Sequence, residues 1–258
     1  MAIDLFSIGR FTVHGYGLMI GLGFLAAVLL ASYEAKRDGM SPDHLTNIAM
    51  WTLVIGFLGG KLLFVIVEVK DFLANPLRAL GSSGFVVYGG IITGILTIFV
   101  YCKVKKISTS DYFDLIATFV PVNQGFGRLG CFMAGCCYGR TTDSWYGVIF
   151  PEGCLAPAGV KLVPTQLIMA FGDFLIFAIL FLLRRKKRLK SGSLSGAYLC
   201  LYSIGRFIVE FFRNDYRGSI GFLSTSQFIA LWTLAAGIIV LILVNKFGKK
   251  IEVDEAKS

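Results

Sequence analysis

The chain has 258 residues, of which 55% are hydrophobic and 16% charged, and it carries a formal net charge of +9. This composition excludes a water-soluble fold, because soluble domains contain about a quarter charged residues and a core of this size could not bury so much apolar surface. The positive charge does not indicate nucleic-acid binding, because the basic residues form short runs beside apolar segments, as they do in membrane proteins.

Seven apolar segments predict an all-α, polytopic membrane protein, since a membrane-spanning helix needs roughly 20 mostly apolar residues. The first segment is too long for the core of a cleavable signal peptide, so we expect a retained helix. The fourth and sixth segments are interrupted by Gly, Arg, Gln or Glu and are the least apolar. Short gaps separate the segments and no internal repeat is evident, which predicts one transmembrane domain over residues 1–258. In chain order the expected helices cover residues 16–33, 46–67, 85–102, 112–132, 165–183, 194–212 and 226–244.

The loops between these segments differ in basic charge, and this difference predicts the orientation, because cytoplasmic loops carry an excess of Lys and Arg. With seven helices, the N-terminus is then outside, the C-terminus is cytoplasmic, and the segment 134–164 forms an outward-facing head. The denser set of loops contains Lys36, Arg37, Lys103, Lys105, Lys106, Arg184, Arg185, Lys186, Lys187, Arg188, Lys190, Lys246, Lys249 and Lys250. The sparser set contains Arg10, Lys70, Arg78, Arg140, Lys161, Arg213 and Arg217.

Ionisable side chains within the expected spans are the first candidates for a functional site, because charges inside a bilayer are costly and usually face a cavity. Arg128 lies near the outer end of the fourth segment, and Lys61 lies in the second. On the sixth, Arg206 and Glu210 are four residues apart and Tyr202 lies one turn earlier, so the three share a helix face. Two arginines on different helices could bind a phosphate through bidentate hydrogen bonds. The alternatives are a structural ion pair for Arg206 and Glu210, and an interfacial arginine for Arg128.

Glycines gather at the outer ends of the third and fourth segments, and two interpretations of them stay open. They either allow close helix packing, or they break a helix so that backbone N–H groups approach an anionic ligand. The glycines concerned are Gly125, Gly127, Gly130, Gly135 and Gly139 in one group and Gly89 and Gly90, which follow Tyr88, in the other.

The chain has six cysteines, and we expect packing or disulfide bonding from them more than catalysis. The spacing of the adjacent pair Cys136 and Cys137 does not match a zinc site well. An outward location allows a disulfide from Cys154 to either member of this pair. No metal-ligand or phosphate-loop motif is present, so we expect neither a metal nor another cofactor. The remaining cysteines are Cys102, Cys131 and Cys200.

The residues 127–140, which read GRLGCFMAGCCYGR, resemble the signature of the prolipoprotein diacylglyceryl transferases. The likeness extends along nearly the whole chain. It includes HGYGLM at 14–19, GGKL at 59–62, YGG at 88–90, PTQL at 164–167, and the segment 202–213 with its spacing of Tyr202, Arg206, Glu210 and Arg213.

This resemblance implies a seven-helix enzyme of the bacterial plasma membrane whose active site faces the outer side. Its donor would be phosphatidylglycerol, and its acceptor would be the lipobox cysteine thiol of a prolipoprotein signal peptide. The product would be a thioether-linked diacylglyceryl cysteine, with glycerol phosphate as the leaving group, in the first step of lipoprotein maturation. By the resemblance the catalytic residues are Arg128, Arg206, Tyr88, Tyr202 and Glu210. The residues expected to bind substrate are Tyr16, Lys61, Gly89, Gly90, Gly127, Cys131, Gly139 and Arg213.

The chain departs from the family pattern at three of these positions. The family commonly has Asn where this chain has Cys131, and Arg where it has Lys61. It also has His where this chain has Tyr88, and a phenol is a poor base at neutral pH. Of the two histidines, His44 is expected on the cytoplasmic side. Either His14 or Glu210 then assists proton removal, or arginines suffice to favour the thiolate, or the reaction has diverged.

Two other functions compete with this interpretation. A paralogue with the same fold could use another acceptor. A transporter could pass an anion along intramembrane arginines, but transporters typically show paired repeats with broken helices in both halves, and this chain shows none.

Overall fold

The computed structural model describes residues 4–8, 11–81, 84–186, 189–213 and 218–248. The expected loop charges Arg10, Lys187, Arg188, Arg217, Lys249 and Lys250 lie outside the described residues. The chain falls into two compact units, one formed by Met1–Leu30 with Asp114–Ser258 and the other by Ala31–Phe113. The interpretation of 1–258 as one domain stays a prediction.

A helix occurs at each of the seven expected positions. Five of these helices are long and apolar enough to cross a membrane, which confirms a mainly helical, multi-pass membrane protein. They are α1 (Gly15–Arg37), α2 (Pro42–Val67), α5 (Val87–Lys105), α7 (Thr165–Arg185) and α9 (Thr225–Phe247). The other two, α6 (Thr109–Ala134) and α8 (Ser193–Glu210), are the segments with the most polar interruptions. Seven membrane spans therefore remain a prediction.

The structure also contains short elements that the apolar pattern did not predict. Two short helices, α3 (Val69–Ala74) and α4 (Pro76–Gly81), follow α2. Three antiparallel hairpins lie outside the long helices, because these connecting segments pair their backbone groups locally. The hairpins are β1 (Asp4–Ile8) with β2 (Phe11–His14), β3 (Val148–Ile149) with β4 (Lys161–Leu162), and β5 (Ser219–Ile220) with β6 (Leu223–Ser224).

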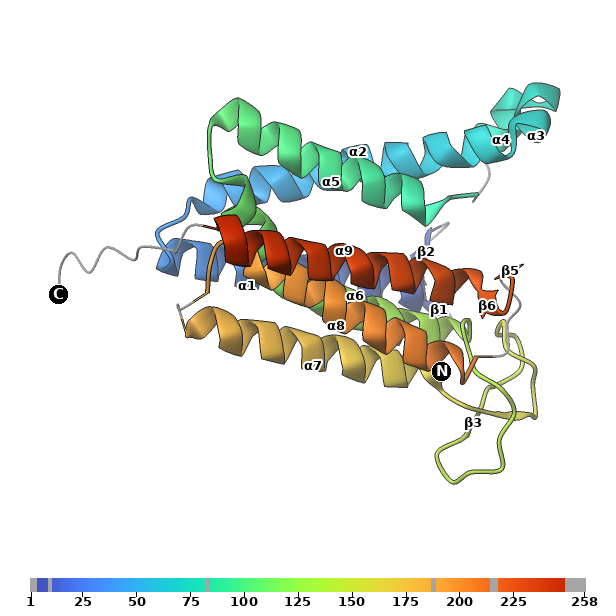
Figure 1. Ribbon diagram of the computed structural model, residues 1–258. Helices are drawn as coiled ribbons and strands as arrows, with labels where there is room; N and C mark the ends of the chain where they lie inside the picture. The colour runs from blue at the N-terminus through green and yellow to red at the C-terminus, as the bar shows by residue number, and fades with distance from the viewer. Residues whose placement is uncertain (1–3, 9–10, 82–83, 187–188, 214–217, 249–258) are drawn as a thin grey trace. The chain divides into compact units, whose positions relative to one another are not determined.

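In the unit Ala31–Phe113, the helices α2 and α5 lie side by side and antiparallel (Figure 1). Glycines bring the two backbones together, since a Cβ atom added at Gly89 would collide with the carbonyl oxygen of Gly59. The Thr93 hydroxyl donates a hydrogen bond across the contact to the carbonyl of Ile55 at 3.2 Å. Close packing through small residues therefore explains Gly89 here, as it commonly does in membrane helices.

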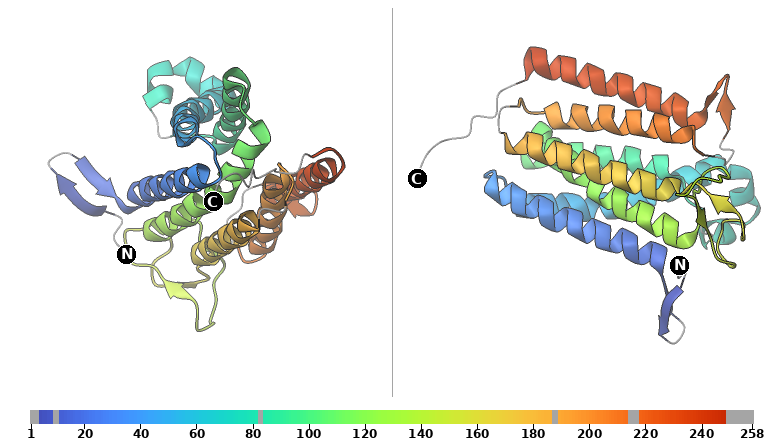
Figure 2. Two further views of the ribbon diagram at one scale, coloured as in Figure 1. Left: turned by 90° about the vertical axis from the view of Figure 1, so that its left-hand side faces the viewer. Right: turned by 90° about the horizontal axis from the view of Figure 1, so that it is seen from below.

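In the other unit, the long helices run side by side with nearly parallel axes (Figure 2). Aromatic rings fill the contact between α6 and α7, where Phe126 and Phe174 meet edge to face at 5.9 Å between ring centroids. Between α8 and α9 the packing is closer, because Gly196 faces Leu241 and Gly237 faces Cys200. These contacts hold α6, α8 and α9 in the positions from which they supply the candidate site.

A buried carboxylate connects α6 to the beginning of α8. Asp114 of α6 is 3% exposed and accepts hydrogen bonds from the backbone N–H groups of Gly192 and Ser195, both at 2.7 Å. The Ser195 hydroxyl adds a third bond at 2.6 Å. The first N–H groups of a helix have no partner within the helix, and its N-terminal dipole favours a negative charge. Asp114 therefore acts as an N-terminal cap supplied by another helix.

We expect Asp114→Asn to destabilise the protein by about 1.5–3 kcal/mol, because hydrogen bonds to a charged group contribute about that much. The NH₂ group of the asparagine would also face one of the backbone N–H groups that now donate to the carboxylate. The measurement is the thermal unfolding temperature in detergent. Asp143→Asn, in the exposed part of the 134–164 loop, is the matched control and should leave that temperature nearly unchanged. Equal unfolding temperatures for the two variants would show that the cap does not stabilise the fold.

Large apolar side chains cover the outward faces of the long helices. Phe57, Leu62, Leu96 and Ile242 are each more than half exposed. Contiguous apolar surface on this scale is not tolerated by soluble proteins. Lipid tails are the solvent that such faces require, in agreement with the apolar composition of these helices.

Candidate active site

The predicted polar face of α8 exists and its charges are paired. Arg206 forms an ion pair with Glu210 at 2.6 Å between Nη1 and Oε2, and the two side chains are 12% and 9% exposed. The second terminal nitrogen of Arg206 donates to the hydroxyl of Ser226 in the first turn of α9, at 2.7 Å. The guanidinium is therefore fixed between two helices, with its planar face and remaining donors held in one orientation.

Tyr202, one turn before Arg206, belongs to an aromatic pair that reaches α6. Its ring stacks on that of Tyr198 with 5.8 Å between centroids. The Tyr198 hydroxyl donates a hydrogen bond to the side-chain oxygen of Gln124 at 3.0 Å. Sequence reasoning did not select Tyr198, Gln124 or Ser226, although polar residues inside apolar segments were the signal that could have found them.

Arg128 of α6 is partly buried in the same unit. Asp173 of α7, Cys131 and Tyr16 lie within range of its charge. Among the described residues no carboxylate forms an ion pair with Arg128. Asp173 is 4% exposed, and its Oδ2 atom has no hydrogen-bond partner in the described part of the chain. Sequence reasoning missed Asp173, the one acidic residue of the fifth apolar segment.

The glycines around Arg128 pack within an unbroken helix, so the broken-helix interpretation of this segment is wrong. A Cβ atom at Gly125 would lie 2.7 Å from the ring of Phe174, and one at Gly130 would lie 3.1 Å from the carbonyl oxygen of Tyr16. Close packing explains these two positions. Gly127 differs, because no atom lies within 4 Å of the place of its Cβ atom.

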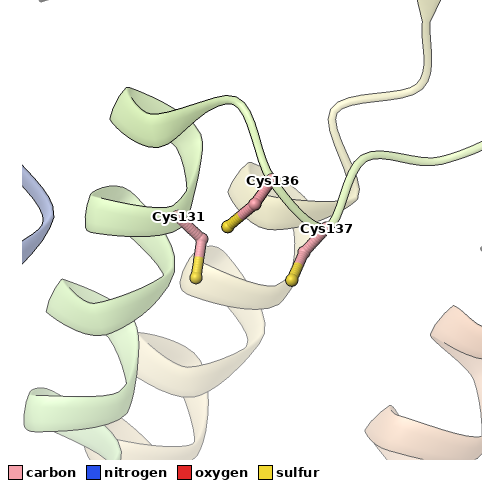
Figure 3. A group of neighbouring side chains, drawn as sticks. All are labelled: Cys131, Cys136 and Cys137. Atoms are coloured by element: carbon pink, nitrogen blue, oxygen red, sulfur yellow. The ribbon is translucent and has the colours of Figure 1, made fainter. Parts of the chain in front are cut away.

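Three cysteines converge at the end of α6. Gly135, with φ +67°, ends the helix, and its backbone N–H donates a hydrogen bond to the carbonyl of Phe132. The N–H of Cys136 donates to the carbonyl of Cys131 at 3.1 Å. This left-handed cap turns the chain back toward the last turn of the helix. Cys137 also has a positive φ, of 62°. The three sulfur atoms gather beside the end of α6 (Figure 3) and all lie within 4.8 Å of one another. We call Cys131, Cys136 and Cys137 the cysteine cluster.

Two fully buried side chains of α7 hold this turn in place. The Gln166 amide donates to the carbonyl of Cys136 at 2.6 Å, and the Thr165 hydroxyl donates to the carbonyl of Cys137 at 2.7 Å. None of the six cysteines, all of which lie in the described part of the chain, forms a disulfide, so the bridge that the sequence allowed from Cys154 is not formed. Cys154 instead donates its thiol to the carbonyl of Pro151 at 3.1 Å.

Gly139 brings the segment after α8 beside the cysteine cluster. It forms a backbone bridge with Arg213, and its N–H donates to the carbonyl of Val163 at 2.8 Å. A Cβ atom at Gly139 would lie 2.5 Å from the carbonyl oxygen of Phe212, so only glycine allows this approach. Hydrogen bonds from the thiols of Cys131 and Cys136, together with the Arg213 guanidinium, hold the pKa of the Cys137 thiol below its ordinary value.

The remaining predicted site residues belong to the unit Ala31–Phe113. Lys61 donates a hydrogen bond to the carbonyl of Gly84 at 3.2 Å and lies over the ring of Phe64. Tyr88 is in the first turn of α5 and is about half exposed. Gly89 and Gly90 follow it at the contact with α2, where Gly90 approaches the carbonyl of Gly56.

Known proteins resemble this chain along nearly its whole length. A family model described as prolipoprotein diacylglyceryl transferase matches residues 4–243. A phosphatidylglycerol–prolipoprotein diacylglyceryl transferase of Clostridium tetani is 44% identical over 248 residues, which are 95% of this chain and 98% of the relative. In Clostridium perfringens, the protein named transferase 2 of this kind is 43% identical over 258 residues, 99% of this chain and all of the relative. The protein named transferase 1 in the same organism is 31% identical over 252 residues, 95% of each chain.

Proposed function

The chain belongs to the prolipoprotein diacylglyceryl transferase family, and from this membership we propose that it transfers the diacylglyceryl group of phosphatidylglycerol to a prolipoprotein cysteine. In this reaction the sulfur of the lipobox thiol bonds to the glycerol carbon. The bond from that carbon to the phosphate oxygen breaks, and its electron pair leaves with glycerol phosphate. The thiol proton is released, and the product is a thioether. This transfer is the first step of bacterial lipoprotein maturation.

The observation that carries the proposal is the state of two partly buried arginines on neighbouring helices of one unit. Arg128 has no carboxylate ion-pair partner among the described residues. Arg206 is oriented by Glu210 and Ser226. A guanidinium matches the geometry of a phosphate, and fixed cations in a site from which water is excluded stabilise the charge of a departing phosphate.

The direct test uses the purified full-length protein, phosphatidylglycerol and a lipobox peptide, with mass spectrometry of the peptide. We expect the cysteine peptide to gain the mass of one diacylglyceryl group, and a peptide with serine in place of that cysteine to gain none. A protein that consumes phosphatidylglycerol without modifying the peptide would use another acceptor. A protein that does neither would contradict the proposed reaction.

We propose seven membrane spans, with the N-terminus and the segment 134–164 outside the plasma membrane and the C-terminus in the cytoplasm. In support, the bonds from Asp114 to Gly192 and Ser195 bring the beginnings of α6 and α8 to one end of their unit. Lys190 donates to the carbonyl of Asn245 near the end of α9, so the basic segments gather at this same end. An excess of Lys and Arg marks the cytoplasmic side.

Cysteine labelling in intact cells checks this orientation, after the native cysteines have been replaced by alanine. We expect a membrane-impermeant reagent to label Asp143→Cys without permeabilisation and Lys186→Cys only after it. Both positions are exposed, so access to the reagent depends on the side of the membrane and not on burial. Labelling of Lys186→Cys in intact cells would reverse the proposed orientation.

We propose that Tyr88 orients the lipid through a hydrogen bond that a phenol or an imidazole can supply. Tyr88→His should keep its activity, and Tyr88→Phe should lose less than about tenfold, the scale of one neutral hydrogen bond. Tyr33→Phe, at an exposed position, is the matched control and should be unaffected. The rate of Tyr88→Phe should still rise with pH as in the wild type, because that rise reports the acceptor thiol. Loss of the rise would show that the phenol itself moves the proton.

A further inference from the structure

The cysteine cluster is the one group of three or more potential metal-ligating side chains that converges within the described residues. Cys131 is buried on the last turns of α6, and Cys136 and Cys137 are partly buried on the turn that follows (Figure 3). We propose that this cluster binds a thiophilic metal ion, Zn²⁺, through three thiolates and leaves one coordination position for a ligand from outside the chain.

The sulfur positions fit this chemistry. Thiolate ligands lie about 2.3 Å from zinc, so two of them in a tetrahedral site are about 3.8 Å apart. The three sulfur atoms are already within 4.8 Å of one another. Side-chain rotations and small backbone shifts can bring them to the metal. The vicinal pair can serve one ion because both of its sulfur atoms, together with that of Cys131, lie within 4.8 Å of one another.

The backbone of the cluster is organised in advance. The cap at Gly135 and the bonds from Thr165 and Gln166 fix the carbonyls on both sides of the turn. A non-glycine residue at positive φ is unfavourable and persists only where the surroundings impose it. The hydrogen bonds from Thr165 and Gln166 are the surroundings that hold Cys137 in this conformation.

The surrounding charges suit an anionic metal–thiolate complex. Three thiolates and one Zn²⁺ carry a net charge of −1. Arg128 lies three residues before Cys131 on α6, and Arg213 forms a backbone bridge with Gly139, two residues after Cys137, so two guanidinium groups are placed near the cluster. Hard cations such as Mg²⁺ prefer oxygen ligands, which this cluster does not offer.

The incomplete ligand set suggests what the ion does. Structural zinc sites are closed by four protein ligands, whereas catalytic sites have three and keep one position open. Within the proposed function, the lipobox thiol occupies that position. A zinc ion held by the three cysteines would lower the pKa of that thiol, so that its proton would leave to solvent. The thiolate would then be poised to attack the glycerol carbon, with glycerol phosphate leaving with the electron pair of the broken carbon–oxygen bond. This role rests on the proposed function, but the metal site itself does not.

A metal titration tests the site without donor lipid or acceptor peptide. The full-length protein in detergent is treated with a chelator and titrated with Cd²⁺, whose bonds to thiolates absorb in the ultraviolet. We expect one Cd²⁺ ion to bind per chain and added Zn²⁺ to displace it. The absorption should be lost in the variant Cys131→Ala, Cys136→Ala, Cys137→Ala. It should persist in the matched variant Cys102→Ala, Cys154→Ala, Cys200→Ala, which removes the other three cysteines.

Two further measurements keep the proposal falsifiable if the first triple variant does not fold. In the wild type, Zn²⁺ should slow alkylation of the three clustered thiols and leave the rate at Cys154 unchanged. The metal site would be overturned if the wild-type protein showed no Cd²⁺–thiolate absorption. It would also be overturned if the clustered thiols were alkylated at the same rate with and without Zn²⁺. A lipobox peptide should strengthen the absorption and its serine counterpart should not. No change with the peptide would overturn the thiol-binding role and leave the site intact.

Discussion

Replacing Arg128 or Arg206 by alanine is expected to lower kcat/KM for lipobox-peptide modification by about 10²–10³-fold. Removing one fixed donor to a developing oxyanion has that order of effect on an enzyme rate. Arg185→Ala is the matched control, because Arg185 lies at the exposed end of α7 over the ring of Phe181. It should retain nearly full activity. Steady-state kinetics with purified variants, together with their unfolding temperatures, measure the effect.

The lysine variants decide between a phosphate-binding role and a structural ion pair for Arg206. Arg206→Ala leaves the Glu210 carboxylate buried without its cation, which costs stability whatever the role of Arg206. Arg206→Lys keeps a positive charge for Glu210 but removes the planar pair of donors that fits a phosphate. We therefore expect Arg206→Lys to be stable and nearly inactive. Wild-type activity in this variant would make the pair structural.

Gly139→Ala is expected to lower activity by about 10²-fold, the scale on which a displacement of about 1 Å in a site is felt. The added Cβ atom would lie 2.5 Å from the carbonyl oxygen of Phe212 and 2.8 Å from a methyl carbon of Thr165. One of these neighbours must move. Movement of Phe212 displaces Arg213, and movement of Thr165 releases the carbonyl of Cys137. Either shift distorts the site while leaving the helices in place.

The matched control for this prediction is Gly172→Ala, in the middle of α7. No atom lies within 4 Å of the position of its Cβ atom, and alanine favours a helix more than glycine does. Its activity should equal that of the wild type, and its unfolding temperature should be the same or higher. Full activity in Gly139→Ala would show that the approach of the Phe212 backbone is not required for transfer.

The positions of the long helices could be predicted from the sequence because they follow from apolar composition over about 20 residues. The shared face of Tyr202, Arg206 and Glu210 followed from helical spacing in the same way. The glycine groups could not be resolved, since one residue type serves close packing, a helix cap or ligand approach. The structure separates these uses: Gly89 and Gly130 pack, Gly135 caps, and Gly127 leaves space.

The cysteine cluster shows a second limit of sequence reasoning. The spacing of the cysteines argued against a shared ligand site, because ordinary backbone at Cys136 and Cys137 would point adjacent side chains apart. Their convergence depends on two left-handed residues, Gly135 and Cys137. Only the first of these is a residue type that signals such a conformation. Asp173 and Ser226 were passed over although each is a polar residue in an apolar segment, and the contact of Ser226 with Arg206 is visible only in the structure.

The hydrogen bonds between α6 and α8 impose an order on the biogenesis of the protein. These two helices are the least apolar of the seven, and a translocon admits such segments poorly when they arrive alone. The beginning of α6 supplies the cap of α8, and Gln124 receives the hydroxyl of Tyr198. The capping carboxylate is synthesised 78 residues before the N–H that it binds. In the proposed seven-span topology, Asp114 and Gln124 of α6 therefore gain these hydrogen-bond partners only after α7 and α8 have been synthesised.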